Sequence, residues 1–178
     1  MEKTPVYDKV KLVTSVIYRE RPFLEKAAAS LERLFGQAES LQMDMDFDYT
    51  DYYREEFGYP LRRRILVFKE LHPIEKAHLS KVSAIRLEQD MSAPSGRTVN
   101  VDPGYVTEAK LVLFTTKDYT HRLYAGDGIF SECTLFFRDG MFHPWQWTYP
   151  DYASENMRKF FEKVRDLYVK DLRSRKNG

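Results

Sequence analysis

The sequence has little of what several common protein classes require. Its 178 residues contain a single cysteine, Cys133, which excludes an intramolecular disulfide and a cysteine-rich zinc site. The formal net charge is only +1, so no overall field attracts nucleic acid or an anionic membrane. No stretch approaches the roughly 20 apolar residues that a membrane-spanning helix needs. We therefore expect a soluble protein without a membrane partner.

The N-terminal stretch MEKTPVYDKVKLVTSV also has no apolar run that precedes a small-residue cleavage site. Secretory signal peptides are recognised by that combination of features. Its absence leads us to expect a cytoplasmic location.

Sequence motifs of the familiar nucleotide-binding and hydrolase folds are missing as well. The chain contains no G-x-x-x-x-G-K-[ST], no G-x-G-x-x-G, no H-E-x-x-H and no G-x-S-x-G. The eight glycines lie where turns are expected, and backbone geometry explains them there. The sequence therefore predicts no metal ligands and leaves any cofactor unknown.

Aromatic residues, in contrast, are abundant. They make up 15% of the chain, as 12 tyrosines, 12 phenylalanines and 2 tryptophans. Aromatic side chains bury much area in a small core and also line ligand clefts. With 43% hydrophobic and 31% charged residues, the composition is that of a globular protein, and we expect one domain over residues 1–178.

The N-terminal half alternates between strand-like and helix-like segments. The strand-like segments are rich in β-branched residues or alternate apolar and polar residues with period two. In the first helix-like segment, apolar residues recur at helical spacing, and Gly36 follows where a C-terminal cap belongs. The predicted strands are Val10–Tyr18, Leu41–Tyr49, Arg62–Glu70 and Arg97–Val101, with helices at Phe23–Phe35 and from Pro73 onward. This βαββαβ order predicts a ferredoxin-like core in an α+β fold.

The C-terminal half predicts an extension of that core. Asp102-Pro103-Gly104 is expected to turn the chain, and Glu108–Phe114 is either a short helix capped by Thr107 or a buried strand. The segments HRLYA, GIFSECTLFF and MFHPWQW, separated by Asp-Gly turns, predict a three-stranded antiparallel meander. A C-terminal amphipathic helix follows from about Asp151.

The segment LQMDMDFDY places aspartates on one face of a predicted strand. Asp44, Asp46 and Asp48 alternate with apolar residues, and Asp51 follows. Carboxylate oxygens of this kind bind hard cations such as magnesium. The simpler interpretation is the solvated face of an edge strand, on which charge discourages aggregation.

Two further aspartates adjoin chain-turning residues. Asp102 precedes Pro-Gly, where its carboxylate would fix a turn, but Asn100 shares its strand face and both could face a cleft. Asp151 follows Pro150, where a helix cap is the first interpretation. Nearby Tyr149 could add a phenol to a pocket.

His121 and Arg122 form the most informative pair. Histidine serves as acid, base or ligand near neutral pH, and Arg122 with Lys117 could hold a phosphate or carboxylate. Adjacent strand residues face opposite sides, so both reach one ligand only at a strand end or a twist. The alternative is a hydrogen-bonded structural histidine beside surface cations.

Glu132 lies within an otherwise apolar predicted strand. An ionised carboxylate there must be paired or exposed, and a paired one often marks a site. Arg122 or His121, on the neighbouring strand of the hairpin, could be its partner. A structural cross-strand ion pair would explain the same residues.

Several segments together resemble a known family. They are FDYTDYYREEFG, RTVNVDPGYV, LFTTKDYTHRLY, GIFSECTLFF and WTYPDY. They are similar to the bacterial and archaeal proteins called domain of unknown function four-four-one-six, some of which carry the automatic label GTP-binding protein. The resemblance covers nearly the whole chain but implies no activity, and the missing phosphate loop gives that label no support.

The resemblance does imply a set of positions that belong to the family's motifs. These positions are Asp51, Tyr52, Tyr53, Asn100, Asp102, Tyr105, Lys117, His121, Arg122, Glu132, Tyr149 and Asp151.

These residues lead to a hypothesis of a polar, aromatic pocket for a small anionic molecule. If the protein is an enzyme, His121 is the acid or base and Glu132 or Asp102 orients it. Hydrolysis of phosphoryl or acyl groups and isomerisation are then all open. The expected ligand-binding residues are Asp51, Tyr53, Arg97, Asn100, Tyr105, Lys117, Arg122 and Tyr149.

Two alternatives belong to other classes of function. Ferredoxin-like sheets with exposed aromatics can bind RNA, and Arg62–Arg64 with the basic C-terminal tail offer phosphate contacts. The aspartates of the second predicted strand and the near-zero net charge weigh against nucleic acid. The other alternative is a non-catalytic partner or scaffold protein, and the sequence leaves the oligomeric state open.

Overall fold

An antiparallel sheet of eight strands organises residues 9–176, the part of the chain that the computed structural model describes. The strand order is β2-β3-β1-β4-β5-β7-β6, and β8 also pairs with β7. The strands are β1 (Lys9–Tyr18), β2 (Met43–Asp46), β3 (Arg62–Pro73), β4 (Val99–Val106), β5 (Lys110–Thr115), β6 (Leu123–Gly126), β7 (Ile129–Arg138) and β8 (Met141–Pro144). With helices on both of its faces, the sheet gives an α+β fold.

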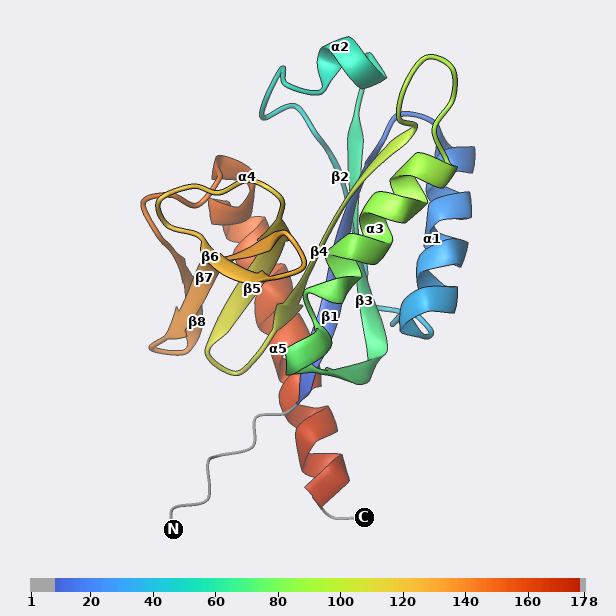
Figure 1. The fold of residues 1–178 in the computed structure, drawn as a ribbon. Helices are drawn as coiled ribbons and strands as arrows, with labels where there is room; N and C mark the ends of the chain where they lie inside the picture. The colour runs from blue at the N-terminus through green and yellow to red at the C-terminus, as the bar shows by residue number, and fades with distance from the viewer. Residues whose placement is uncertain (1–8, 177–178) are drawn as a thin grey trace.

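Helices cover the two faces of the sheet (Figure 1). They are α1 (Arg21–Phe35), α2 (Arg54–Phe57), the 3-10 turn η1 (Ile74–Lys76), α3 (Leu79–Asp90), α4 (Pro150–Ala153) and α5 (Glu155–Lys176). Alternation along β1 sends Leu12 and Val16 toward α1 and α3, and Val13 toward α5. None of the described helices is both long and apolar enough to cross a membrane.

Most predicted elements of the N-terminal half are present, with shifted ends. The first and third strands are longer than predicted, and β2 is shorter. Met43 and Met45 face the core while Asp44 and Asp46 are exposed, as the alternation predicts. β2 forms one edge of the sheet, so its aspartates lie where the edge-strand interpretation places them.

The turn predicted at Asp102-Pro103-Gly104 is wrong, because these residues continue β4. They pair with Ser15, Thr14 and Val13 of β1. Alternation along β4 directs the backbone nitrogen of Pro103 away from β1, and β4 pairs with β5 only from Gly104 onward. The missing N–H of the proline is therefore tolerated within the strand.

Gly104 is needed for close strand packing instead of a turn. A Cβ atom at this position would lie 2.2 Å from the carbonyl oxygen of Val112 on β5. The neighbouring segment is strand β5, so the buried-strand alternative is correct and the helix over Glu108–Phe114 is wrong. Leu111 and Val112 are buried there, which a fully packed strand explains.

β7 has three partners, which corrects the predicted meander. β5 pairs along one edge of β7, while β6 and β8 share the other edge. Phe130 lies opposite both Thr115 and Tyr124, and Leu135 lies opposite both Leu111 and Pro144. β7 has ten residues and β6 and β8 have four each, so one edge accommodates both short strands.

The C-terminal helix is present, but its predicted cap is wrong. Asp151 lies in the short helix α4, and α5 begins at Glu155. Ser154 Oγ accepts a hydrogen bond from the N–H of Met157 at 3.4 Å, so Ser154 occupies the capping position. The predicted apolar stripe, which includes Met157 and Val164, is buried against the sheet.

β4 and β5 are not paired in the part of β4 that precedes Gly104, and side chains of α3 bind the β4 backbone there instead. The N–H of Val101 donates to Glu88 Oε1 at 2.5 Å, and Lys81 Nζ donates to the carbonyl oxygen of Val101 at 2.8 Å. Side chains of a helix thus replace a neighbouring strand at this part of β4. Asn100 and Asp102, two of the predicted site residues, lie on this part of β4.

Candidate functional site

Asp102 belongs to a polar network that we call the Asp102 network: Glu56, Lys81, Glu88, Arg97, Asn100 and Asp102. Lys81 Nζ donates to Asp102 Oδ1 at 2.8 Å, and Asn100 Nδ2 donates to Oδ2 at 2.6 Å. Burial alone would raise the pKa of Asp102, but Lys81 and Asn100 bring the pKa below its usual range. This carboxylate is therefore ionised and has both oxygens occupied.

Arg97 holds the other end of the Asp102 network. It donates to both oxygens of Glu56, at 2.7 and 2.8 Å, and to Glu88 and Asn100, at 3.1 and 3.0 Å. Hydrogen bonds from Arg97 lower the pKa of Glu56, whereas burial raises the pKa of Glu88. The cations Lys81 and Arg97 are thus neutralised by carboxylates within the protein.

Glu132 is the centre of a second group, which we call the His121 cluster: Lys117, Tyr119, His121, Arg122, Glu132 and Trp147. Glu132 Oε1 forms a hydrogen bond with His121 Nε2, and Arg122 Nε lies 3.8 Å from the same oxygen. Both partners of Glu132 that the sequence analysis considers are therefore present. The Glu132 side chain is buried on β7, where such partners are required.

A turn allows neighbouring residues to reach one carboxylate. His121 and Arg122 precede β6, and the N–H of Arg122 donates to the carbonyl oxygen of Tyr119 at 2.9 Å. Outside a strand, adjacent side chains are not forced onto opposite faces. Because His121 and Arg122 lie just before the first residue of β6, both side chains can reach one group.

Rings enclose the imidazole of His121. Trp147 stacks on it with a centroid distance of 5.2 Å and an interplanar angle of 18°, and Tyr119 lies at 6.3 Å. The His121 side chain is 20% exposed. Among the described residues, its Nδ1 atom has no hydrogen-bond partner. One ring nitrogen is therefore held by Glu132 and the other is free.

The segment around α2 contacts both groups. Lys117 Nζ lies 4.6 Å from the ring centroid of Tyr52 and 3.4 Å from its hydroxyl oxygen. The next residue, Tyr53, packs on Phe57 at 5.8 Å, and the Arg97 guanidinium lies 5.5 Å from the same Phe57 ring. Burial and then the charge of Asp102 raise the pKa of the Tyr53 phenol. The adjacent Tyr52 and Tyr53 thus connect the Asp102 network with the His121 cluster.

Tyr152 provides a second connection. Its phenol is buried on α4, and burial raises its pKa. The charges of Asp102 and Glu132 raise this pKa further, while Arg63 lowers it. The two carboxylates therefore act on the same phenol, although Asp102 forms no hydrogen bond with His121 in the described structure.

Arg63 is a buried arginine that is not among the predicted site residues. It forms a buried ion pair with Asp151, and its guanidinium lies 4.5 Å from the ring centroid of Phe47 and 5.1 Å from that of Tyr152. The signal is available in the RRRILVF segment, because strand alternation places Arg63 on the face of the buried Ile65.

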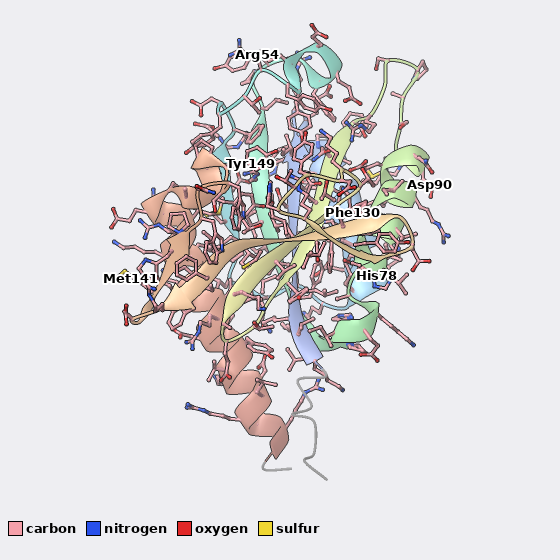
Figure 2. The ribbon with its side chains drawn as sticks, turned by 60° about the vertical axis from the view of Figure 1, so that its left-hand side comes forward. Arg54, His78, Asp90, Phe130, Met141 and Tyr149 are labelled. Atoms are coloured by element: carbon pink, nitrogen blue, oxygen red, sulfur yellow. The ribbon has the colours of Figure 1, made fainter. Side chains whose placement is uncertain are left out.

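Three predicted ligand-binding residues lie apart from both groups. Asp51 is exposed and pairs with Arg54 at 2.9 Å, at the outer end of the molecule (Figure 2). Tyr105 packs against Phe114 at 5.7 Å on the face that α1 and α3 cover, and burial raises its pKa. Tyr149, just before α4, is 53% exposed (Figure 2).

The aspartates of β2 are already occupied by arginines. Arg62 and Arg64 contact the two oxygens of Asp44 at 2.6 Å each, and Arg62 also contacts Asp46 at 2.5 Å. Across the described residues, no group of three or more His, Cys, Asp or Glu side chains is arranged to hold a metal ion. These contacts favour the edge-strand interpretation of the acidic segment.

Two hollows lie away from the polar groups. One, of about 480 Å³, follows the α5 surface from Arg165 to Ser174. The other, of about 120 Å³, lies where α1 meets Ala38, Gln42 and β3. Neither is lined by residues of the Asp102 network or the His121 cluster.

These features define an α+β protein whose extended antiparallel sheet carries a histidine–carboxylate pair backed by aromatic rings. The model of the family Domain of unknown function (DUF4416) matches residues 8–168, and the chain belongs to this family. No curated protein and no solved structure matches the chain.

Proposed function

We propose that the His121 cluster binds a small anionic molecule that bears a phosphate or carboxylate group. Nδ1 of His121 would accept a hydrogen bond from a protonated oxygen of the ligand, such as the hydroxyl of hydrogen phosphate, and Lys117 and Arg122 would supply positive charge. Glu132 would orient the imidazole by accepting a hydrogen bond from Nε2–H. The cations of the Asp102 network are already paired within the protein, so we assign them a supporting role.

The observation that carries this proposal is the contact of both His121 and Arg122 with one buried carboxylate. An ionised carboxylate at Nε2 requires the proton on that nitrogen, so the lone pair of a neutral imidazole is on Nδ1. Arg122 Nε is buried and has no hydrogen-bond partner among the described residues. The lone pair of Nδ1 can therefore accept a hydrogen bond from a protonated oxygen of a ligand, and the positive charge of Arg122 beside it favours a ligand that is an anion.

The same arrangement would support acid–base chemistry. A bound group with a transferable proton could exchange it with Nδ1 of His121, while Glu132 stabilises the imidazolium that forms. Glu132 then has the orienting role, and Asp102 acts only through the field it shares at Tyr152. The class of reaction stays open within this proposal.

Inorganic phosphate is a suitable first probe, because it presents the charged group without any other chemistry. Binding at a hundred times the dissociation constant should raise the free energy of unfolding by about 2.7 kcal/mol, which a thermal-shift assay detects. We expect His121→Ala to abolish this stabilisation, measured against the melting temperature of the same variant without phosphate, because the substitution also removes a partner of the buried Glu132 carboxylate.

Two other histidines supply matched controls. His78 forms a histidine–carboxylate pair with Asp127 at 2.8 Å, and His143 stacks on Phe136 at 5.3 Å. His78→Ala and His143→Ala should keep the full response to phosphate. No phosphate response in the parent protein, or an equal loss in all three variants, would contradict the proposed site.

We also propose the finer description of the fold. The antiparallel order β2-β3-β1-β4, with α1 and α3 on one face, supports a ferredoxin-like core for the N-terminal half. The sheet continues into the C-terminal half, which supports one domain over residues 1–178. A cytoplasmic location is a further part of the proposal.

The alternative functions receive less support from the packing. α1 and α3 pack on one face of the sheet and α5 on the other, which leaves less of the described sheet for stacking RNA bases. Residues 177–178 of the basic tail lie outside the described residues. An RNA affinity that falls steeply with salt would favour the RNA alternative, and a stable complex without phosphate binding would favour a scaffold.

A further inference from the structure

Five rings form a continuous series that ends at His121. From β8 inward, the series runs His143, Phe136, Trp145, Trp147 and His121. Successive centroids are 5.3, 4.4, 5.0 and 5.2 Å apart. Trp147 is nearly parallel to both of its neighbours, at 12° to Trp145 and 18° to His121. We call these five rings the aromatic ladder.

The aromatic ladder is anchored to the backbone. Trp147 Nε1–H donates to the carbonyl oxygen of Cys133 on β7 at 3.0 Å. Thr148 Oγ1 accepts from the N–H of Trp145 at 2.8 Å and donates to the carbonyl oxygen of Thr134 at 2.6 Å. Both indoles are thus tied to the strand that carries Glu132.

The geometry suits support better than ligand stacking. Trp145 is 38% exposed, but its ring is already in contact with Phe136 and Trp147. A ring-bearing ligand would need a free aromatic face, which inner rings of such a series do not offer. Within the aromatic ladder, only Trp147 contacts the imidazole of His121, so support of that imidazole comes from Trp147.

We infer that Trp147 is a positioning residue that fixes the imidazole plane of His121, so that the lone pair of Nδ1 is presented to a protonated oxygen of the ligand. This inference rests on the proposed function. Glu132 selects the tautomer by holding Nε2, and Trp147 restrains rotation of the ring, since a rotated imidazole would lose the stack. Glu132 alone would not fix the plane of the imidazole, and Trp147 alone would not fix which ring nitrogen carries the proton.

The first test uses the unmodified protein. Nitrogen-15 shifts of His121 should show Nε2 protonated and Nδ1 unprotonated in the neutral ring. The carbon-bound protons of the ring should be shifted upfield by the ring current of Trp147. His121→Ala identifies these resonances among those of the four histidines. A proton on Nδ1, or the absence of an upfield shift, would overturn the inference without any substitution in the aromatic ladder.

The second test compares three variants with inorganic phosphate as the probe. Trp147→Leu should remove the upfield shift and weaken phosphate binding about tenfold, which corresponds to about 1.4 kcal/mol. Trp147→Phe keeps a ring but loses the bond to Cys133, so an intermediate affinity is expected. Trp145→Leu, which does not touch His121, is the control and should leave affinity within about twofold.

The outcomes separate this inference from the proposed function. Phosphate binding by the parent protein that Trp147→Leu leaves unchanged would overturn the positioning role while the anion site stands. Absence of phosphate binding in the parent protein would remove the anion site, and the His121 resonances would still decide whether the ring is held as inferred.

Discussion

Arg63 and Asp151, which are 88 residues apart in the chain, form a buried ion pair that joins β3 to α4. Their side chains are 7% and 5% exposed. Loss of one partner of such a pair costs about 3–5 kcal/mol, because the other charge stays buried without compensation. We expect Asp151→Asn to lower the free energy of unfolding by that amount in urea titrations. Recovery of most of the loss in the double variant Arg63→Met/Asp151→Leu would support this explanation, and an unchanged midpoint for Asp151→Asn would contradict it.

The contact between Lys117 and Tyr52 predicts competition with an anion. An exposed cation–π contact is worth about 0.5–1 kcal/mol, which a ligand at Lys117 would have to replace. Tyr52→Ala should therefore strengthen phosphate binding about two- to fivefold, whereas Lys117→Met should weaken it. Titrations at two salt concentrations measure both changes. If Tyr52→Ala weakens binding, Tyr52 is itself part of the ligand contact.

Glu88 should make the protein less stable as the pH rises above 4.5. Burial, partly offset by Lys81, raises the pKa of this carboxyl above its ordinary value of 4.5. The native state then binds the proton more tightly than the unfolded state, so stability is highest below 4.5 and declines as the pH rises through the native pKa. Glu88→Gln should flatten this decline in unfolding free energies measured from pH 4.5 upward.

Asp44 should act in the opposite sense. Burial would raise its pKa, but hydrogen bonds from Arg64 and Arg62 bring it below the ordinary 3.8. Its contribution to stability is therefore present above pH 3.8 and is lost as the pH falls through the native pKa. Asp44→Asn should reduce the acid-induced fall. If Glu88→Gln and Asp44→Asn change the slope of unfolding free energy against pH with the same sign, the opposite pKa directions of Glu88 and Asp44 would be refuted.

Gly104 predicts a steric effect on the seam between β4 and β5. Because a Cβ would meet the carbonyl oxygen of Val112 at 2.2 Å, Gly104→Ala should separate the strands and cost about 1–3 kcal/mol. Faster hydrogen exchange of the β5 amides would reveal the separation. Gly128→Ala is the control: its Cβ would meet no atom within 4 Å, so only its positive φ of 76° is strained. Equal exchange in both variants would show that the close approach is not the cause.

Local periodicity was sufficient to predict the elements whose apolar residues recur at regular spacing. The apolar spacing of α1 and α5 and the alternation of β2 predict both the element and its buried face, because each depends only on neighbouring residues. The pairing of Glu132 with His121 and Arg122 was also predictable, since a hairpin brings adjacent strands together.

Long-range placement was not predictable in the same way. The contacts of Lys81 and Glu88 with Val101 depend on where α3 crosses β4, and no local pattern encodes that crossing. The proline and glycine of Asp102-Pro103-Gly104 suggested a turn because both residue types favour turns. In the fold, this proline and glycine lie within β4, and the pairing of β4 with β1 and β5 depends on the tertiary arrangement.

The seam between the two halves of the sheet consists of three residue pairs, Gly104–Leu113, Tyr105–Val112 and Val106–Leu111. In the part of β4 that precedes Gly104, the backbone of Val101 bonds to Lys81 and Glu88 of α3, while β5 pairs with β7. Among the described residues, β4 and β5 form no ladder pairs there. α5 packs against strands of both halves, so its apolar contacts as well as this short seam hold the two halves of the sheet together.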